Sequence, residues 1–114
     1  MIAQAVQVAD VIYLSGQVGV DEQGKAPDSL VAQTTLAYQH VKAVLAEFGA
    51  TLDNVVEETV FVTDISQTMA QVQEVFAVRA AAYGGRPDVA QTLVAVSALV
   101  DQAFKIEIKC TAHL

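Results

Sequence analysis

The last part of the chain alternates strictly between apolar and polar residues. Between Phe104 and Ala112 every second residue is apolar, and each residue between them is polar. An alternation of period two is typical of a β-strand that buries one face. The pattern therefore predicts a half-buried strand over 104–112, with the carboxylate of Glu107 at the centre of its polar face.

Two other extended runs precede this strand. Residues 91–96 begin with the polar Gln91 and continue with apolar and β-branched residues. If this run pairs with the last strand, Glu107 and Gln91 could share a cleft, and that pair is the best lead to function in the residues themselves. The run 55–62 is rich in β-branched residues and lies between two predicted helices, so we expect a parallel crossover strand there.

The beginning of the chain predicts a β-hairpin. Short apolar runs between Ala5 and Val20 flank a turn at Ala9 and Asp10, and the second run leads into Ser15-Gly16-Gln17. A polar loop punctuated by glycine and proline follows over 21–27.

The first predicted helix follows this loop. Asp28 or Ser29 can cap it, and Gly49 is expected to end it. Its apolar stripe recurs at steps of three and four residues and comprises Leu30, Thr34, Ala37, Val41, Val44, Leu45 and Phe48.

The second predicted helix follows the crossover strand. Asp64 or Ser66 can cap it, and Gly84 and Gly85 end it before Arg86-Pro87. Its stripe comprises Met69, Val72, Phe76, Ala80 and Tyr83, and we expect these side chains in the core rather than around a ligand.

The predicted order of elements is β-β-α-β-α-β-β, an α+β fold in which two helices cover one face of a sheet. With 114 residues the chain is expected to form a single domain spanning 1–114. Two helices shield one face only, so the other face would need cover as well. Packing of sheet against sheet between subunits would supply it.

Composition narrows the possible partners. Hydrophobic residues make up 54% of the chain and charged residues 17%, which favours an oligomer that hides apolar surface. The net charge of -7 repels polyanions and anionic lipid, so neither nucleic acid nor membrane is expected as a partner. The lone Cys110 falls in the apolar series of the last strand and fits a reducing, cytoplasmic location. The N-terminal residues predict neither a targeting signal nor a membrane segment.

Few residues suggest other chemistry. Ser15 before Gly16 could be a nucleophile, but no histidine or aspartate stands at a triad spacing. His40 and His113 do not form a metal-binding pattern, and the glycines do not form a nucleotide-binding loop. We therefore expect neither a metal nor an organic cofactor.

Several landmarks along the chain occur together in one known family. They are Ser15-Gly16-Gln17, the helix end at Gly49, the run from Val60 to Asp64, Arg86-Pro87, and the run from Lys105 to Ile108. In this order and spacing the chain resembles the RidA/YjgF reactive-intermediate deaminase family, also called the endoribonuclease L-PSP family, over nearly its full length. The resemblance implies a chorismate-mutase-like fold, a homotrimer, and three small-molecule clefts at the subunit interfaces.

The resemblance also implies an activity. Enzymes of this family hydrolyse 2-imino and 2-enamino acids to 2-oxo acids and ammonia without a cofactor. An arginine on the strand before the last holds the substrate carboxylate, and a glutamate on the last strand helps to position the attacking water. The glutamate is present here as Glu107, whereas the arginine position carries Gln91.

Other cleft positions follow from the same resemblance. Ser15 and Gly16 are expected to line the cleft, and Gln73 aligns near a polar pocket residue. Leu93 stands where a cysteine is common, and Ile2 where family members carry a tyrosine. These departures imply either a substrate without a free carboxylate or a family member that is not a deaminase.

Replacing arginine by glutamine has an energetic consequence. A guanidinium–carboxylate contact is charge-assisted, and losing it in a desolvated cleft costs about 1.5–3 kcal/mol. Gln91 could still bind a neutral amide, a lactam or a hydroxyl.

Three functions remain open. The first is a trimeric imine or enamine hydrolase that uses Glu107 and Gln91. The second is a small-molecule-binding or chaperone-like trimer without catalysis, and the third, ranked last because of the negative charge, is an endoribonuclease. The plainest alternative for Glu107 is a solvated strand face in which it pairs with Lys105 and Lys109.

Overall fold

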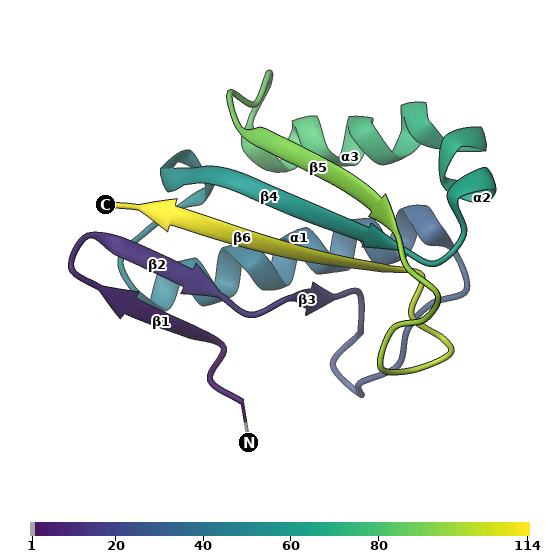
Figure 1. Ribbon diagram of the computed structural model, residues 1–114, viewed down its shortest axis with the longest axis horizontal. Coiled ribbons are helices and arrows are strands. Elements are labelled where there is room, and N and C mark those ends of the chain that lie inside the picture. The colour runs from purple at the N-terminus through teal and green to yellow at the C-terminus, as the bar shows by residue number, and fades with distance from the viewer. Residues whose placement is uncertain (1) are drawn as a thin grey trace.

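A six-stranded sheet forms one layer of the computed structural model, which describes residues 2–114 (Figure 1). Helices form the second layer. The strands lie side by side in the order β1 (Ala5–Val8), β2 (Val11–Leu14), β6 (Ile106–His113), β4 (Val55–Val62) and β5 (Ala90–Ala95), and the short β3 (Gln17–Val18) also pairs with β6.

The predicted hairpin is confirmed. β1 and β2 pair antiparallel, and the turn between them places Ala9 at a positive φ of 51°. β2 then pairs antiparallel with β6, which brings the two ends of the chain together in one sheet.

The centre of the sheet is formed by the last strand, β6. It pairs antiparallel with both β2 and β4, while β4 pairs parallel with β5 across the helical crossover. The premise that the last two strands of the chain pair with each other is therefore wrong, because β4 lies between them. β1 and β5 form the two edges of the five-strand path.

The first predicted helix is α1 (Leu30–Glu47). The hydroxyl of Ser29 accepts a hydrogen bond from the backbone N–H of Ala32 across 3.1 Å and caps it, and Gly49 follows its end at a φ of 72°. Its buried residues include most of the predicted stripe: Leu30, Gln33, Thr34, Ala37, Tyr38, Val41, Val44 and Leu45. A short 3₁₀ turn, η1 (Leu52–Asn54), then leads into β4.

The second predicted helix is broken into α2 (Ile65–Ala70) and α3 (Val72–Tyr83). Asp64 caps α2 as predicted, but the break at Gln71 turns a different side of α3 toward the sheet. Met69 and Phe76, expected in the core, are 53% and 39% exposed, whereas Val75 is only 3% exposed. The predicted stripe was therefore wrong for those two residues. Gly84, at a φ of 81°, ends α3.

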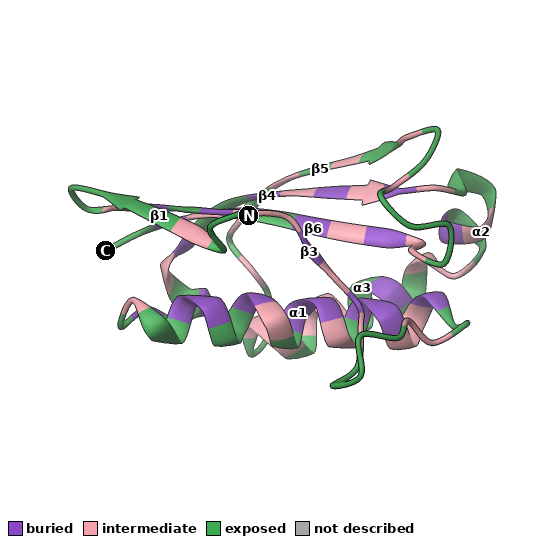
Figure 2. Cartoon of the chain, turned by 90° about the horizontal axis from the view of Figure 1, so that it is seen from below, coloured by how far each residue is buried: buried purple, intermediate pink, exposed green. Residues whose placement is uncertain are grey.

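α1 and α3 cover the same face of the sheet (Figure 2). The core between the layers includes Cys110, which is 1% exposed, as its place in the alternating strand predicted. Within residues 2–114 no helix covers the opposite sheet face (Figure 2), which carries the exposed apolar side chains Val6, Tyr13 and Val94. Within the described residues, no helix is both long and apolar enough to cross a bilayer.

Candidate functional site

Glu107 projects from the uncovered face of the sheet. Its neighbours along β6, Ile106 and Ile108, are fully buried beneath the sheet, so the alternation of the strand turns Glu107 the other way. It lies opposite Val18 of β3 and Phe61 of β4 in the strand register, and it is half-buried.

Gly16 lies directly against the carboxylate of Glu107. A methyl group at the Cα of Gly16 would overlap the carboxyl oxygen and carbon of Glu107, so any larger residue would displace that side chain. Glycine is required here by this close approach and not by an unusual φ angle. The sequence landmark Ser15-Gly16 and the candidate Glu107 are thus neighbours in space.

Ser15 uses its hydroxyl within the chain. The Oγ–H donates to the carbonyl of Ala3 across 2.7 Å, and the backbone N–H of Ser15 donates to Gln4 across 2.8 Å. These bonds attach the N-terminal segment next to Gly16, so Ser15 shapes the surroundings of Glu107 through the backbone. Its oxygen remains able to accept a hydrogen bond.

The two lysines beside Glu107 do not pair with it. Within residues 2–114 the only ion pair joins Arg79 and Glu58, far along the sheet from Lys105. The alternative of a salt-bridged strand face is therefore not formed, and the carboxylate of Glu107 is free of ionic partners within the described chain.

Gln91 projects from the other face of the sheet. In β5 it lies opposite Glu58 of β4, and its Nε2 donates to Glu58 Oε2 across 2.9 Å. Because β4 separates β5 from β6 and the two side chains point to opposite faces, Gln91 and Glu107 do not share a cleft within one chain.

The partner of Gln91 is the centre of a buried polar cluster that sequence reasoning missed. Glu58 is only 2% exposed and lies on the helix-facing side of β4. Its carboxylate accepts hydrogen bonds from four side chains: Tyr38 (3.0 Å to Oε2), Tyr83 (2.7 Å), Arg79 Nε (2.8 Å) and Gln91 Nε2 (2.9 Å). We call these five residues the Glu58 cluster.

Packing reinforces the Glu58 cluster. The rings of Tyr38 and Tyr83 meet edge to face, with centroids 5.9 Å apart, and the guanidinium carbon of Arg79 lies 5.4 Å from the centroid of the Tyr83 ring. Burial raises the pKa of Tyr38 far above its usual range, and the adjacent Glu58 carboxylate raises it further. Burial is also the main cause of the raised pKa of Tyr83, and Cys110 and Glu58 add to it. Both phenols therefore remain hydrogen-bond donors to Glu58 at neutral pH.

Leu93 and Gln91 line a small cavity between the sheet and the helices α1 and α3. Phe76 and Arg79 of α3 also border it, and its volume of about 10 Å³ suits roughly one water molecule. Gln73 is exposed on α3 and does not border this cavity. The predicted site residues thus form two groups in one chain, Glu107 with Gly16 on one sheet face and Gln91 with Leu93 on the other, with Gln73 apart.

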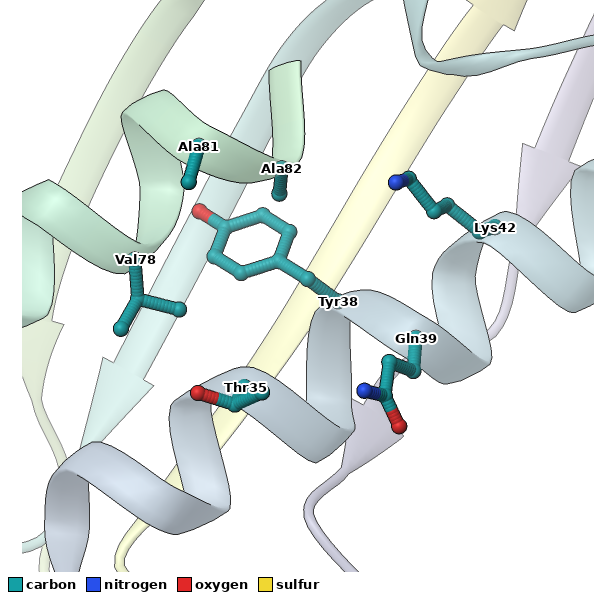
Figure 3. Close-up of a pocket in the computed structure, with 7 residues that line it drawn as sticks. All are labelled: Thr35, Tyr38, Gln39, Lys42, Val78, Ala81 and Ala82. Atoms are coloured by element: carbon teal, nitrogen blue, oxygen red, sulfur yellow. The ribbon is translucent and has the colours of Figure 1, made fainter. Parts of the chain in front are cut away.

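A larger groove lies on the outer side of the helices, between α1 and α3 (Figure 3). Its volume is about 260 Å³, and none of the predicted site residues lines it. Figure 3 shows the ring of Tyr38 crossing from α1 toward Ala81 and Ala82, with Lys42 at the rim. The residues around the groove are Thr35, Tyr38, Gln39, Lys42, Val78, Ala81 and Ala82.

The described residues do not contain a cluster of side chains that could bind a metal ion. No three His, Cys, Asp or Glu side chains of residues 2–114 come together as a metal site would require.

Comparison with known proteins shows a match to one protein family over nearly the whole chain. The family model described as Endoribonuclease L-PSP matches residues 2–114. The chain belongs to the RidA/YjgF family. The relatives bear out the resemblance and the fold class expected from the sequence landmarks.

Three relatives illustrate the similarity of this Rid-family chain. The RutC family protein YjgH of Escherichia coli K12 is 31% identical over 110 residues, which cover 96% of this chain and 80% of YjgH. The crystal structure of RidA from the Antarctic bacterium Psychrobacter sp. PAMC 21119 superposes with a TM-score of 0.83 at 32% identity, covering 97% of this chain and 86% of RidA. That of E. coli TdcF with bound serine gives a TM-score of 0.86 at 26% identity, covering 100% and 88%.

Proposed function

We propose that this Rid-family protein is a homotrimer that hydrolyses a small imine or enamine to a carbonyl compound and ammonia in clefts between its subunits. The observation that carries the proposal is the position of Glu107, whose half-buried carboxylate lies against Gly16 on the uncovered sheet face and has no ionic partner in the described chain. Such a carboxylate is free to accept a proton from water.

Assembly would complete the site. The uncovered sheet face carries Val6, Tyr13 and Val94, each at least 39% exposed in the single chain, and an interface would bury them. Gln91 and Leu93 lie at the β5 edge, on the opposite side of the sheet from Glu107. A cleft that uses both groups therefore takes Glu107 from one copy, with Gln91 contributed by a second copy.

The reaction needs little from the protein. A protonated imine is already electrophilic at carbon, so water adds to that carbon as Glu107 accepts one of the water protons. The C–O bond forms while the C=N π bond becomes a nitrogen lone pair, which gives a carbinolamine. Glu107 then returns its proton to the nitrogen. The C–N bond breaks with its electron pair leaving on ammonia, while the hydroxyl group of the carbinolamine gives its proton to Glu107 and its oxygen forms the C=O bond of the carbonyl compound.

One relative, TdcF of E. coli, supports this reaction class in two ways. TdcF of E. coli carries a name that assigns it provisionally to the reactive intermediate deaminases, and it is 31% identical over 74 residues, which cover 64% of this chain and 57% of TdcF. The TdcF structure contains bound serine, which is a small amino acid.

The test is the rate of imine hydrolysis. Purified protein is mixed with 2-iminopropionate, or with its carboxamide, and the remaining imine is trapped with semicarbazide. Acceleration that falls at least about tenfold in Glu107→Gln, a loss typical of a removed general base, supports the proposal. Equal rates with and without protein, or a monomer by sedimentation velocity, would refute it.

A second candidate is ligand binding without catalysis. It is favoured by Gln91, whose neutral amide already donates one of its two N–H groups to Glu58 and supplies no positive charge in place of a substrate-binding arginine. The variant Gln91→Arg separates the two, because a gain of hydrolysis would show a deaminase scaffold lacking one cation. An endoribonuclease stays last, since a net charge of -7 opposes polyanion binding.

A further inference from the structure

The hydrogen bond to Glu58 decides which way the amide of Gln91 faces. An ionised carboxylate only accepts hydrogen bonds, so the atom of Gln91 that meets Glu58 must be the donor nitrogen. That contact is 2.9 Å long. The carbonyl oxygen Oε1 of the same amide is consequently turned away from the Glu58 cluster.

The outward-facing oxygen has no partner within residues 2–114. No described side chain or backbone N–H donates to Gln91 Oε1, and this oxygen is not fully enclosed. A ligand reaching Gln91 at the β5 edge therefore meets a hydrogen-bond acceptor. An N–H group of the ligand would complement it, and a ligand carbonyl could accept from the second Nε2–H, which Glu58 does not use. A carboxamide or lactam can make both bonds, whereas a carboxylate can only accept and would leave Oε1 without a donor.

The charges around Gln91 also disfavour a ligand carboxylate. Arg79 is the single cation among the residues that border the cavity beside Gln91. Its Nε already donates to Glu58 across 2.8 Å, and the pair is neutral as a whole. A ligand carboxylate would lose its hydration here without gaining a free cation.

From these contacts we infer that Glu58 determines the ligand class of this protein: the position of Gln91 selects a neutral group that bears an N–H donor, such as a carboxamide or lactam, over a free carboxylate. Glu58 acts here as a positioning residue, because it orients Gln91 and neutralises Arg79 without reaching the ligand itself. The inference rests on the proposed function only in taking Gln91 as part of the ligand cleft.

Pyruvamide and pyruvate make the matched test, because they differ mainly in a carboxamide against a carboxylate. Binding of each to the full-length protein is followed by NMR titration. We expect pyruvamide to bind about tenfold more tightly than pyruvate. This factor corresponds to the one hydrogen bond to Gln91 Oε1 that pyruvamide can make and pyruvate cannot. The inference would be overturned if pyruvate bound with the same affinity as pyruvamide, or if neither compound bound.

Variants identify the residue responsible. Gln91→Leu removes the acceptor but leaves the Arg79–Glu58 pair, so pyruvamide should lose the part of its advantage that comes from the hydrogen bonds of Gln91. Gln23→Leu makes the same change on an exposed turn and should leave the preference as it is. A preference of the same size in Gln91→Leu as in the unmodified protein would overturn the role of Gln91.

Glu58→Gln tests the positioning role. It frees the Gln91 amide to turn and leaves Arg79 positively charged, so the preference should shift toward pyruvate by about tenfold or more. An unchanged preference in folded Glu58→Gln overturns the inference; if that variant does not fold, Gln91→Leu decides. Sedimentation and imine hydrolysis on the same samples report separately on the proposed function, so a trimeric, Glu107-dependent hydrolase without the pyruvamide preference refutes this inference alone.

Discussion

Arg79 of α3 and Glu58 of β4 form an ion pair of 2.8 Å between the helix layer and the sheet. The side chain of Glu58 is fully buried and that of Arg79 is 14% exposed, so water screens the pair little. Two tyrosines and Gln91 satisfy the remaining acceptor positions of the carboxylate. The pair therefore joins α3 to β4, and the hydrogen bond from Gln91 extends this network to β5.

Removing the cation should destabilise the fold strongly. Arg79→Met leaves Glu58 buried without a counter-charge, and breaking such a pair costs about 3–5 kcal/mol. Urea unfolding measures the change in the free energy of unfolding. Arg86→Met removes an exposed arginine as the control, with an expected change within about 0.5 kcal/mol. Similar values for the two variants would show that the pair contributes little.

High pH should destabilise the protein through its buried tyrosines. The pKa values of Tyr38 and Tyr83 are raised by folding, so above their ordinary value of 10.0 the unfolded state loses protons that the folded state keeps. The stabilisation is complete below pH 10 and declines as pH rises, at up to about 1.4 kcal/mol per pH unit for each tyrosine. Urea unfolding at increasing pH tests this, with Tyr38→Phe expected to reduce the slope. A stability that stays flat above pH 10 would contradict it.

The buried thiol should be unreactive in the native protein. Burial raises the pKa of Cys110 from 9.0 to about 12, and the thiol lies on the helix-facing side of β6, opposite Glu58 in the register. A thiol-reactive chromophore should therefore label the native protein no faster than the protein unfolds, and should label it at once in concentrated urea. Rapid stoichiometric labelling of folded protein would mean that this side of β6 is accessible.

Local patterns predicted the elements of this fold better than their arrangement. The alternation from Phe104 to Ala112 identifies a strand because side chains of a strand face alternate sides by geometry. It does not reveal that this last strand inserts between β2 and β4, which depends on contacts far apart in sequence. No glycine or proline marks the break at Gln71 in the sequence. The pattern therefore predicts one continuous helix with one apolar stripe.

The candidate site divides in the same way. Glu107 was named from the alternation of its strand and, together with Gly16, through the family landmarks, and the structure brings the two residues together. Glu58 was missed because it follows Glu57 in a strand whose face was not assigned. The signal was available: Val60 and Val62 are apolar at alternate positions, so position 58 falls on the buried face and a carboxylate there requires partners.

Two glycines should respond differently to the same substitution. In Gly16→Ala the new methyl group meets the side chain of Glu107, whereas in Gly19→Ala it meets the backbone of Gln33 in α1. A side chain can move away and a helix backbone cannot, so Gly19→Ala should be the more destabilising by about 1–3 kcal/mol, the cost of overpacking. Gly16→Ala should instead reduce imine hydrolysis by displacing Glu107. Adding Glu107→Ala should restore the urea stability of Gly16→Ala but not that of Gly19→Ala, and equal behaviour of the two double variants would show that Gly16 does not contact Glu107 in solution.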